Sequence, residues 1–177
     1  MKLPPLGIQS YCFRAFGSLS ELVDITRRAE LHRLELWPGH LAHDAPEALE
    51  RARACLPEGL CFSSYGLAVF GADPAANEAV FRFARGLGME AVTATVEGDG
   101  KVWTEVALQA RDHGVKLAVH NHGKSCPHGS RDQMEALLNR SAEAVGLCLD
   151  TAWAMEAGED PVALLRDFGD RIYGIHL

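Results

Sequence analysis

Short apolar runs alternate with longer amphipathic segments along almost the whole chain. The segments between the runs have helical periodicity, and we predict six helices there. The apolar runs predict seven strands: Gly7–Tyr11, Arg33–Trp37, Leu60–Tyr65, Ala91–Val96, Val115–His120, Val145–Asp150 and Arg171–Leu177. Because the strands recur at the length of a βα unit, the pattern favours a parallel sheet.

Helix start signals support this division of the chain. Two predicted helices begin with an aspartate followed by a proline, at Asp73-Pro74 and Asp160-Pro161, which is an N-cap before the first helical residue. The fourth helix, roughly Val102 to Asp112, has the weakest start signal. Three other helices are predicted to start at capping-box pairs: Ser18 with Glu21, Asp44 with Glu47, and Ser130 with Gln133.

The fold class is α/β, and the choice lies between an open doubly wound sheet and a closed (β/α)8 barrel. The turn after the first predicted strand has no G-x-G-x-x-G, so a nucleotide-binding sheet has little support. Polar residues gather at strand ends throughout, as a barrel requires for its active site. We therefore predict a (β/α)8 TIM barrel.

The length of the chain adds an expectation about completeness. A barrel of this type usually has about 250 residues, whereas this chain has 177. We expect a single domain over residues 1–177 that lacks the last helix, strand and helix. The first and seventh strands would then be unpaired edges, which invite pairing with another chain, so a homo-oligomer is one expected state.

Three of the predicted strands carry a residue at their ends that can bind a metal. These residues are His120, Asp150 and His176. Because the carboxyl ends of neighbouring strands meet at one end of a barrel, we predict that their side chains converge on one divalent metal ion, Mn, Mg, Co or Zn. The structural alternatives are a histidine that caps its strand, an aspartate that caps the next turn, and a core histidine.

Two glutamates are predicted to take part in catalysis. Glu97 follows the fourth strand and is a candidate ligand or general base; the alternative is a solvated turn residue. Glu35 lies inside the second strand, where a charge is unexpected unless it faces a polar site. It would then bind substrate or orient a metal ligand; the alternative is a buried ion pair with Arg14 or Arg33.

Four residues near the strand ends are predicted to contact a small-molecule substrate. His122 is two residues from His120 and would point to the same side of the strand, whereas Asn121 would point to the other. Trp37 and Trp153 offer aromatic surface for a ligand ring. The nearby Cys126-Pro127-His128 segment matches no common zinc framework, so we expect a loop of the active site there.

Charge and cysteine usage exclude several classes of partner. The net charge of −7 argues against nucleic acid, because phosphate binding needs clustered Lys and Arg. Five cysteines without a C-x-x-C indicate reduced thiols rather than a disulfide framework. The N-terminus lacks a long apolar stretch, and no run approaches a membrane span. We therefore expect a cytoplasmic protein.

The order of these motifs resembles the xylose-isomerase-like TIM barrels, the sugar phosphate isomerase/epimerase family. The resemblance runs from Gly-Ile-Gln-Ser-Tyr-Cys-Phe through Leu-Glu-Leu-Trp to His-Asn-His-Gly. Its strongest stretch is Gly-Leu-Cys-Leu-Asp-Thr-Ala-Trp-Ala-Met-Glu-Ala-Gly-Glu-Asp-Pro, followed by Arg-Ile-Tyr-Gly-Ile-His-Leu. It covers most of the chain and implies the same barrel fold.

The resemblance also implies a metal site and a reaction. Asp150 and His176 match the family's sixth-strand Asp and seventh-strand His, while His120 stands where a fifth-strand Glu is common. The family's eighth-strand Glu has no counterpart, and Trp153 stands where a His usually follows the Asp.

The implied activity is isomerisation or epimerisation of a sugar or sugar phosphate by proton transfer next to a carbonyl, with Glu97 as the best remaining candidate to move the proton. One alternative is a catalytically silent sugar- or metal-binding barrel domain. An endonuclease IV-like phosphodiesterase is disfavoured by the acidic charge and by missing histidines.

Overall fold

The sheet is parallel, and its strands follow one another in space in the order of the chain. The computed structural model describes residues 5–177. The strands are β1 (Ile8–Gln9), β2 (Arg33–Leu36), β3 (Cys61–Phe70), β4 (Ala91–Val96), β5 (Lys116–His120), β6 (Val145–Asp150) and β7 (Ile172–His176). A doubly wound sheet reverses its order at a switch point, whereas this one runs from β1 to β7 without a reversal. The predicted barrel architecture is therefore confirmed.

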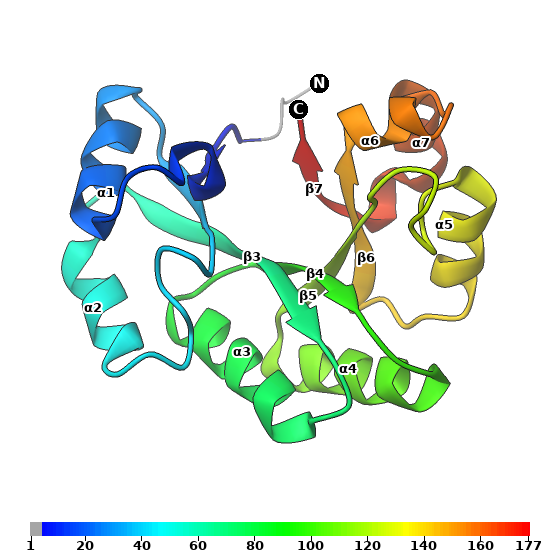
Figure 1. Cartoon of the computed structure of the whole chain (residues 1–177), viewed down its shortest axis with the longest axis horizontal. Helices are drawn as coiled ribbons and strands as arrows, with labels where there is room; N and C mark the ends of the chain where they lie inside the picture. Colours follow the sequence, from blue (N-terminus) through cyan, green and yellow to red (C-terminus); the bar gives the residue numbers. More distant parts are fainter. Residues whose placement is uncertain (1–4) are drawn as a thin grey trace.

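Helices surround the curled sheet on its outer side, and the curl is open between β1 and β7 (Figure 1). Two short 3-10 helices, η1 (Ser10–Phe13) and η2 (Gly169–Arg171), follow β1 and precede β7. The α-helices are α1 (Leu19–Arg28), α2 (Ala48–Cys55), α3 (Pro74–Gly86), α4 (Gly100–His113), α5 (Arg131–Asn139), α6 (Thr151–Glu156) and α7 (Pro161–Phe168). No helix in residues 5–177 is long and apolar enough to cross a membrane.

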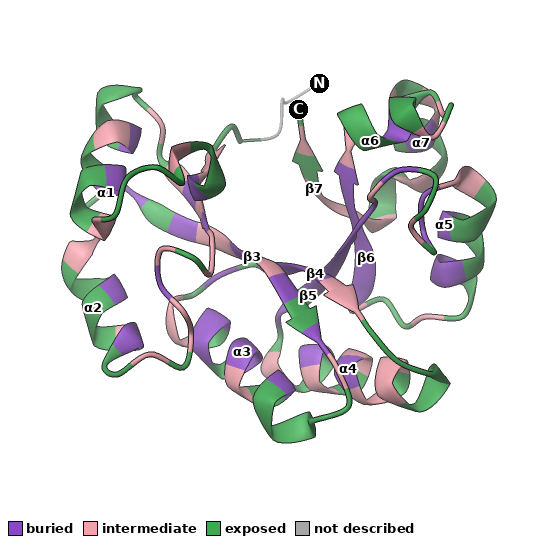
Figure 2. Cartoon of the chain, in the orientation of Figure 1, coloured by how far each residue is buried: buried purple, intermediate pink, exposed green. Residues whose placement is uncertain are grey.

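The main apolar core lies between the strands and this outer layer of helices (Figure 2). Alternate strand residues such as Leu34, Phe62, Leu117 and Leu147 are buried there. Because successive residues of a strand point to opposite faces, the residues between them point into the barrel. This inner face carries Glu35, His120 and other polar side chains, and so the fold itself separates the core from the site.

Residues 5–177 contain one α-helix more than the six predicted. Asp150 ends β6 and also caps a short helix, α6, by accepting a hydrogen bond from the N–H of Trp153 at 2.9 Å. The start of α4 is also earlier than predicted, at Gly100, because Asp99 accepts hydrogen bonds from the N–H groups of Lys101 and Val102. In both places an aspartate N-cap in the sequence marks the start of the helix.

Two other predicted element boundaries, the start of the second helix and the end of the first strand, were wrong for local reasons. The Asp44–Glu47 pair does not form a capping box: Glu47 precedes α2 with φ 54° and makes no capping hydrogen bond. The first strand is shorter than predicted because η1 begins at Ser10, whose hydroxyl accepts a hydrogen bond from the N–H of Trp37 at 2.8 Å. In contrast, the Ser130–Gln133 capping box is confirmed.

The third strand is longer than predicted and continues through Gly66 to Phe70. A side chain at Gly66 could not be accommodated, since a Cβ there would lie 2.6 Å from the Cβ of Thr93 and 2.9 Å from Oε1 of Glu35. The glycine therefore marks a close approach to the site rather than the end of the strand. The first four residues, which belong to the segment where no signal peptide was expected, lie outside the described residues.

Candidate active site

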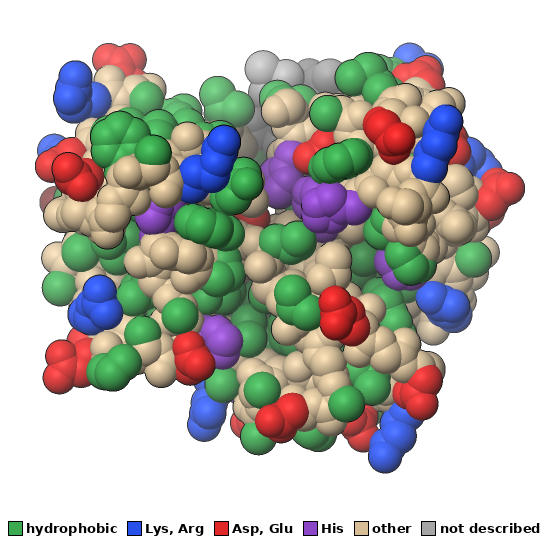
Figure 3. Space-filling view, in the orientation of Figure 1, with side chains coloured by type: hydrophobic (Ala, Val, Ile, Leu, Met, Phe, Trp, Pro, Cys, Tyr) green, Lys and Arg blue, Asp and Glu red, His purple; other side chains and the backbone are tan. Residues whose placement is uncertain are grey.

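Three histidines form a cluster on the inner face of the barrel. Nε2 of His120, on β5, lies 3.1 Å from Nδ1 of His176, on β7. The other ring nitrogen of His120 lies 3.1 Å from Nδ1 of His122. Histidine side chains gather near the middle of the face shown in Figure 3. The structure thus brings the side chains of His120 and His176 together, from two of the three predicted strand ends.

Asp150 joins the cluster from β6 and uses its two carboxylate oxygens differently. Oδ1 caps α6, whereas Oδ2 lies 3.6 Å from Nε2 of His120 and 3.9 Å from Nδ1 of His176. The backbone after β6 fixes this arrangement, because the capping bond orients the carboxylate. The two functions that the sequence offered for Asp150, a cap and a ligand, are thus compatible in one side chain.

Glu35 closes the cluster on the side of β2. Its Oε2 lies 3.0 Å from Nε2 of His176, and its Oε1 accepts a hydrogen bond of 3.3 Å from Gln9. The alternative ion pair with Arg33 does not form, since Arg33 pairs with Glu90 at 2.9 Å. Glu35 therefore faces the polar site and orients a histidine.

The protonation of the cluster follows from these contacts. Burial alone would raise the pKa of Glu35, but its hydrogen bond and charge interaction with His176 hold that pKa below the usual value. Burial alone would lower the pKa of His176, yet its contacts with Cys148 and Glu35 raise it well above the usual value. For His120, burial and then the neighbouring histidine charges lower the pKa. The metal-free site thus favours a charged His176 beside a neutral His120.

Asn121 is buried at the end of β5, between the ends of β5 and β6. Its amide nitrogen donates to the backbone carbonyl of Asp150 at 3.0 Å, and its Oδ1 accepts from the N–H of Asp150 at 2.7 Å. The side chain therefore joins the ends of β5 and β6 and holds Asp150 in place. These two bonds engage both ends of the amide.

The two predicted tryptophans lie in different surroundings. The ring of Trp153 lies 5.4 Å from that of His122 and is 40% exposed, beside the histidine cluster. Trp37 follows β2 and packs edge-on against the rings of Tyr11 and His40. The distance between ring centroids is 5.1 Å in each pair. Trp153 thus offers an accessible aromatic face next to the cluster, whereas Trp37 packs within its own group of rings.

Glu97 stands apart from these residues. It is exposed in the turn after β4, and within residues 5–177 its side chain makes no hydrogen bond or ion pair with the histidine cluster. Its backbone N–H donates to the carbonyl of Phe70 at 2.9 Å, which fixes the turn. The structure thus brings Glu35, but not Glu97, into contact with the cluster.

The family is decided by a comparison with known protein families. A model described as the xylose isomerase-like TIM barrel matches residues 82–177, just over half of the chain. The chain belongs to the xylose isomerase-like TIM barrel family. This match includes β5, β6 and β7, which supply His120, Asp150 and His176.

Two curated relatives match parts of this barrel in sequence. The rhizopine catabolism protein MocC of Rhizobium meliloti is 31% identical over 80 residues, which are 45% of this chain and 24% of that protein. The inosose dehydratase of Clostridium beijerinckii is 32% identical over 69 residues, or 38% of this chain and 23% of that protein. The matched segments span only about a quarter of these relatives.

Solved structures of the same fold are more distant in sequence. The IOLI protein with a bound zinc atom superposes with a TM-score of 0.76 at 16% identity, covering 96% of this chain and 70% of that one. An L-ribulose 3-epimerase superposes with a TM-score of 0.71 at 21% identity, covering 98% and 69%. These similarities establish the fold of the barrel.

The residues of this barrel fit a metal ion, as judged from the spacing of their donor atoms. The nitrogens of His120 and His176 and Oδ2 of Asp150 lie 3.1 to 3.9 Å from one another. Ligands of one metal, each about 2.0–2.2 Å from the ion, have separations of this order. In addition, the Glu35 carboxylate fixes Nε2 of His176 as a donor, which leaves Nδ1 to face the ion.

Two residues of the site were missed from the sequence. Gln9 hydrogen-bonds Glu35, and Cys148 lies within 4.8 Å of ligand atoms of His120 and His176. The signal for Cys148 was available, since it precedes Asp150 by two residues and therefore shares its face of β6. Gln9 gave no comparable signal, because its partner lies on another strand.

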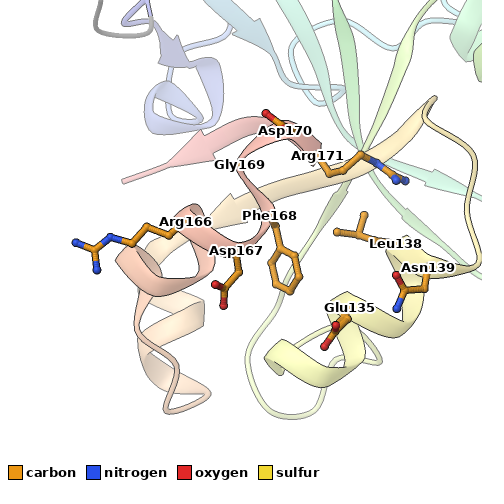
Figure 4. A pocket seen from close by; sticks show the side chains of 9 residues that line it. All are labelled: Glu135, Leu138, Asn139, Arg166, Asp167, Phe168, Gly169, Asp170 and Arg171. Carbon is orange, nitrogen blue, oxygen red and sulfur yellow. The ribbon is translucent and has the colours of Figure 1, made fainter. Parts of the chain in front are cut away.

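A groove of about 430 Å³ lies elsewhere on the barrel, between α5, α7 and η2 (Figure 4). Arg171 lines it, but its guanidinium donates to the backbone carbonyls of Val145, Ser141 and Ala142. Because Val145 begins β6 and Arg171 precedes β7, this groove is at the end of the strands opposite to the histidine cluster. The guanidinium of Arg171 is thus engaged by the backbone, and Arg166 is the other basic residue that lines the groove. We assign the groove no chemistry.

Proposed function

We propose that the histidine cluster is the active site of a metal-dependent sugar or sugar-phosphate isomerase or epimerase. The observation that carries the proposal is the convergence of His120, Asp150 and His176 from three neighbouring strand ends, with donor atoms 3.1 to 3.9 Å apart. Such a mouth at the carboxyl ends of the strands is where barrels of this kind place their active sites. Membership of the family supports the same reading.

Each residue of the cluster has a distinct part in this proposal. His120, Asp150 and His176 would hold the divalent cation, which supplies Lewis-acid chemistry to a carbonyl and a neighbouring hydroxyl. Glu35 is a positioning residue, because its contact of 3.0 Å with Nε2 of His176 fixes that ring. Asn121 positions Asp150 through two backbone hydrogen bonds.

The proton next to the carbonyl must be moved by a side chain at the mouth. We assign this part to His122, whose ring lies between His120 and the exposed face of Trp153. Histidine is the side chain that enzymes use most often for proton transfer. Glu97 stays the alternative predicted from the sequence; the loop that carries it would have to move toward the cluster to reach a bound substrate.

The substrate would be a small polyhydroxylated carbonyl compound. Trp153 gives an apolar face against which a sugar ring could pack, while the polar cluster beside it suits hydroxyl groups. Trp37 stays a predicted substrate contact from its position after β2, although its ring packs on Tyr11 and His40 rather than beside the cluster. The chain's net charge of −7 is consistent with a small molecule rather than nucleic acid as partner.

A dehydratase is the second candidate, favoured by the relative named as an inosose dehydratase at 32% identity. Both reactions begin in the same way: the C–H bond next to the carbonyl breaks, the proton passes to a base, and the electron pair moves toward the carbonyl oxygen. In an epimerase or isomerase a proton then returns to carbon. In a dehydratase the neighbouring C–O bond breaks instead, and the hydroxyl leaves as water after it takes up a proton.

Solvent exchange tests the shared first step. The chain, stripped of metal and then supplied with Mg²⁺, Mn²⁺, Co²⁺ or Zn²⁺, is incubated in deuterium oxide with a panel of ketoses, ketose phosphates and cyclic polyol ketones. We expect metal-dependent incorporation of deuterium beside the carbonyl, which NMR detects. An unsaturated product would identify the dehydratase, whereas a rearranged sugar would identify the isomerase or epimerase.

Two variants make the result specific for this site. Asp150→Asn should abolish the exchange, and His122→Gln should reduce it by the roughly 10²–10⁴-fold that a proton-transfer group contributes. Glu97→Gln serves as the comparison, with activity retained if His122 moves the proton. Absence of exchange with every substrate and metal would instead favour a catalytically silent sugar- or metal-binding domain.

A further inference from the structure

A buried thiol lies directly beneath the proposed metal ligands. Cys148 is on the inner face of β6, two residues before Asp150, and is 1% exposed. Small residues surround it: Ala91 and Ala118 belong to the same inner cluster, with Tyr173 packed against them. On the neighbouring strand it faces Gly174, where even a Cβ would lie 3.3 Å from the sulfur. The sulfur thus lies close to the backbone of β7, where a side chain larger than glycine would crowd it.

The thiol shares two neighbours with the Asp150 carboxylate. One donor atom from each of His120, Cys148 and His176 lies within 4.8 Å of the other two. The same two imidazoles have Oδ2 of Asp150 at 3.6 and 3.9 Å. The pair of histidines is therefore flanked by an oxygen donor from Asp150 and by a sulfur donor one step deeper in the barrel.

We propose that Cys148 is a ligand of the metal, as a thiolate, and that it makes the site selective for zinc or cobalt over magnesium and manganese. The inference deepens the proposed function, since it rests on the same metal site. Sulfur and imidazole donors suit zinc and cobalt, whereas magnesium and manganese prefer oxygen. Two histidines, one cysteine and one carboxylate are also a ligand set of the size that zinc takes.

The protonation change that accompanies binding is simple. The sulfur–hydrogen bond of Cys148 breaks, the proton is released to solvent, and the electron pair forms the bond to the cation. No oxidant or further reagent is required. A role in packing alone would need no thiol at this position, because a small apolar side chain would fill the same space.

Cobalt absorption gives a direct readout that does not depend on activity. The full chain is treated with a chelator and titrated with Co²⁺, and thiolate coordination is detected as a sulfur-to-cobalt charge-transfer band in the near ultraviolet. We expect one equivalent of Co²⁺ to develop the band. Cys148→Ser should lose it, whereas Cys61→Ser, which alters an exposed cysteine on β3, should keep it.

Zinc affinity provides the second readout. Competition with a chelating dye should show that Cys148→Ser binds Zn²⁺ at least about tenfold more weakly, since loss of even an indirect partner of a ligand typically has that effect. Its affinity for Mg²⁺ should not change. The Zn²⁺ affinity of Cys148→Ala is measured in parallel. Thermal unfolding of both metal-free variants shows which of them fold, and the comparison uses a variant that folds.

The outcomes separate this inference from the proposed function. Stoichiometric Co²⁺ binding without the band, no Co²⁺ binding at all, or equal Zn²⁺ affinity in the folded Cys148 variants would overturn the thiolate ligand. Deuterium exchange by a cobalt-loaded chain without the band would leave the proposed function intact. If the charge-transfer band appears but no deuterium exchange is detected, Cys148 is a thiolate ligand and the proposed enzymatic function is contradicted.

Discussion

Glu35 and His176 meet inside the barrel although 141 residues separate them in the chain. Oε2 of Glu35 lies 3.0 Å from Nε2 of His176, and both side chains are largely buried. The pair links β2 to β7 across the interior, beyond the hydrogen bonds between neighbouring strands. It also fixes which nitrogen of His176 faces the cluster, so one contact serves both the fold and the site.

Removal of the Glu35 carboxylate should destabilise the metal-free chain. Glu35→Ala leaves His176 buried without its partner, and breaking a buried pair in this way typically costs about 3–5 kcal/mol. The free energy of unfolding, measured in urea with a chelator present, checks this. Glu90→Ala is the matched control, because it removes an exposed ion pair with Arg33 and should cost less than about 1 kcal/mol. Equal losses in the two variants would contradict the account.

The general architecture could be predicted from the sequence because it depends on local pattern. Alternating apolar and amphipathic segments predicted the barrel and its strand order, and the strand ends pointed to His120, Asp150 and His176, which lie together in the candidate site. A parallel sheet with sequential strands brings these ends together whatever the loops do. For Glu35 the prediction rested on a different argument, that a charge inside an apolar strand is unexpected unless it faces a polar site.

Partnerships across the barrel could not be predicted in this way. The curl of the sheet decides which nitrogen of His176 meets Glu35. It also brings Gln9 close enough to donate a hydrogen bond to Glu35. β3 also continues past the predicted end through Gly66, where it passes close to Thr93 of β4. Glu97 ends a strand like the others, but no pattern in the sequence says that its turn carries it away from the cluster.

The two oxygens of Asp150 can be separated by mutation. Asp150→Asn keeps a side-chain oxygen for the N–H of Trp153 but removes the charge next to His120 and His176. We expect it to lose metal affinity with little loss of stability. Asp150→Ala also loses the cap of α6 and should be destabilised by about 1 kcal/mol more.

Calorimetric metal titration and urea unfolding of both variants check this. Asp160→Ala is a control, since Asp160 caps α7 through the N–H of Val162 at 2.9 Å and has no contact with the cluster among the described residues. It should lose stability but keep the metal. Unchanged metal affinity in Asp150→Asn would show that this carboxylate is only a cap.

His128 should make stability depend on pH. It is buried beside Trp103, and burial together with the charge of Arg140 lowers its pKa to about 4. Because the folded state holds it neutral, its contribution is complete above the unfolded pKa of about 6.5. It is lost as the pH falls from there toward 4, where the loss reaches on the order of 3 kcal/mol.

The difference in unfolding free energy between the chain and His128→Phe, measured from pH 7 to pH 4, isolates this contribution. The difference should diminish toward acid pH as the histidine loses its advantage. His32→Gln changes an exposed histidine and should leave the pH profile as it was. A His128→Phe profile parallel to that of the unmodified chain would refute the prediction.

Anomalous diffraction from crystals of the chain grown with zinc, recorded at the zinc absorption edge, tests the convergence of the strand ends on one metal most directly. The account predicts a single strong peak about 2.0–2.3 Å from Nε2 of His120 and Nδ1 of His176. Asp150 and Cys148 should face the same peak. An interior without a peak, or a peak held by other residues such as Cys126 and His128, would contradict it.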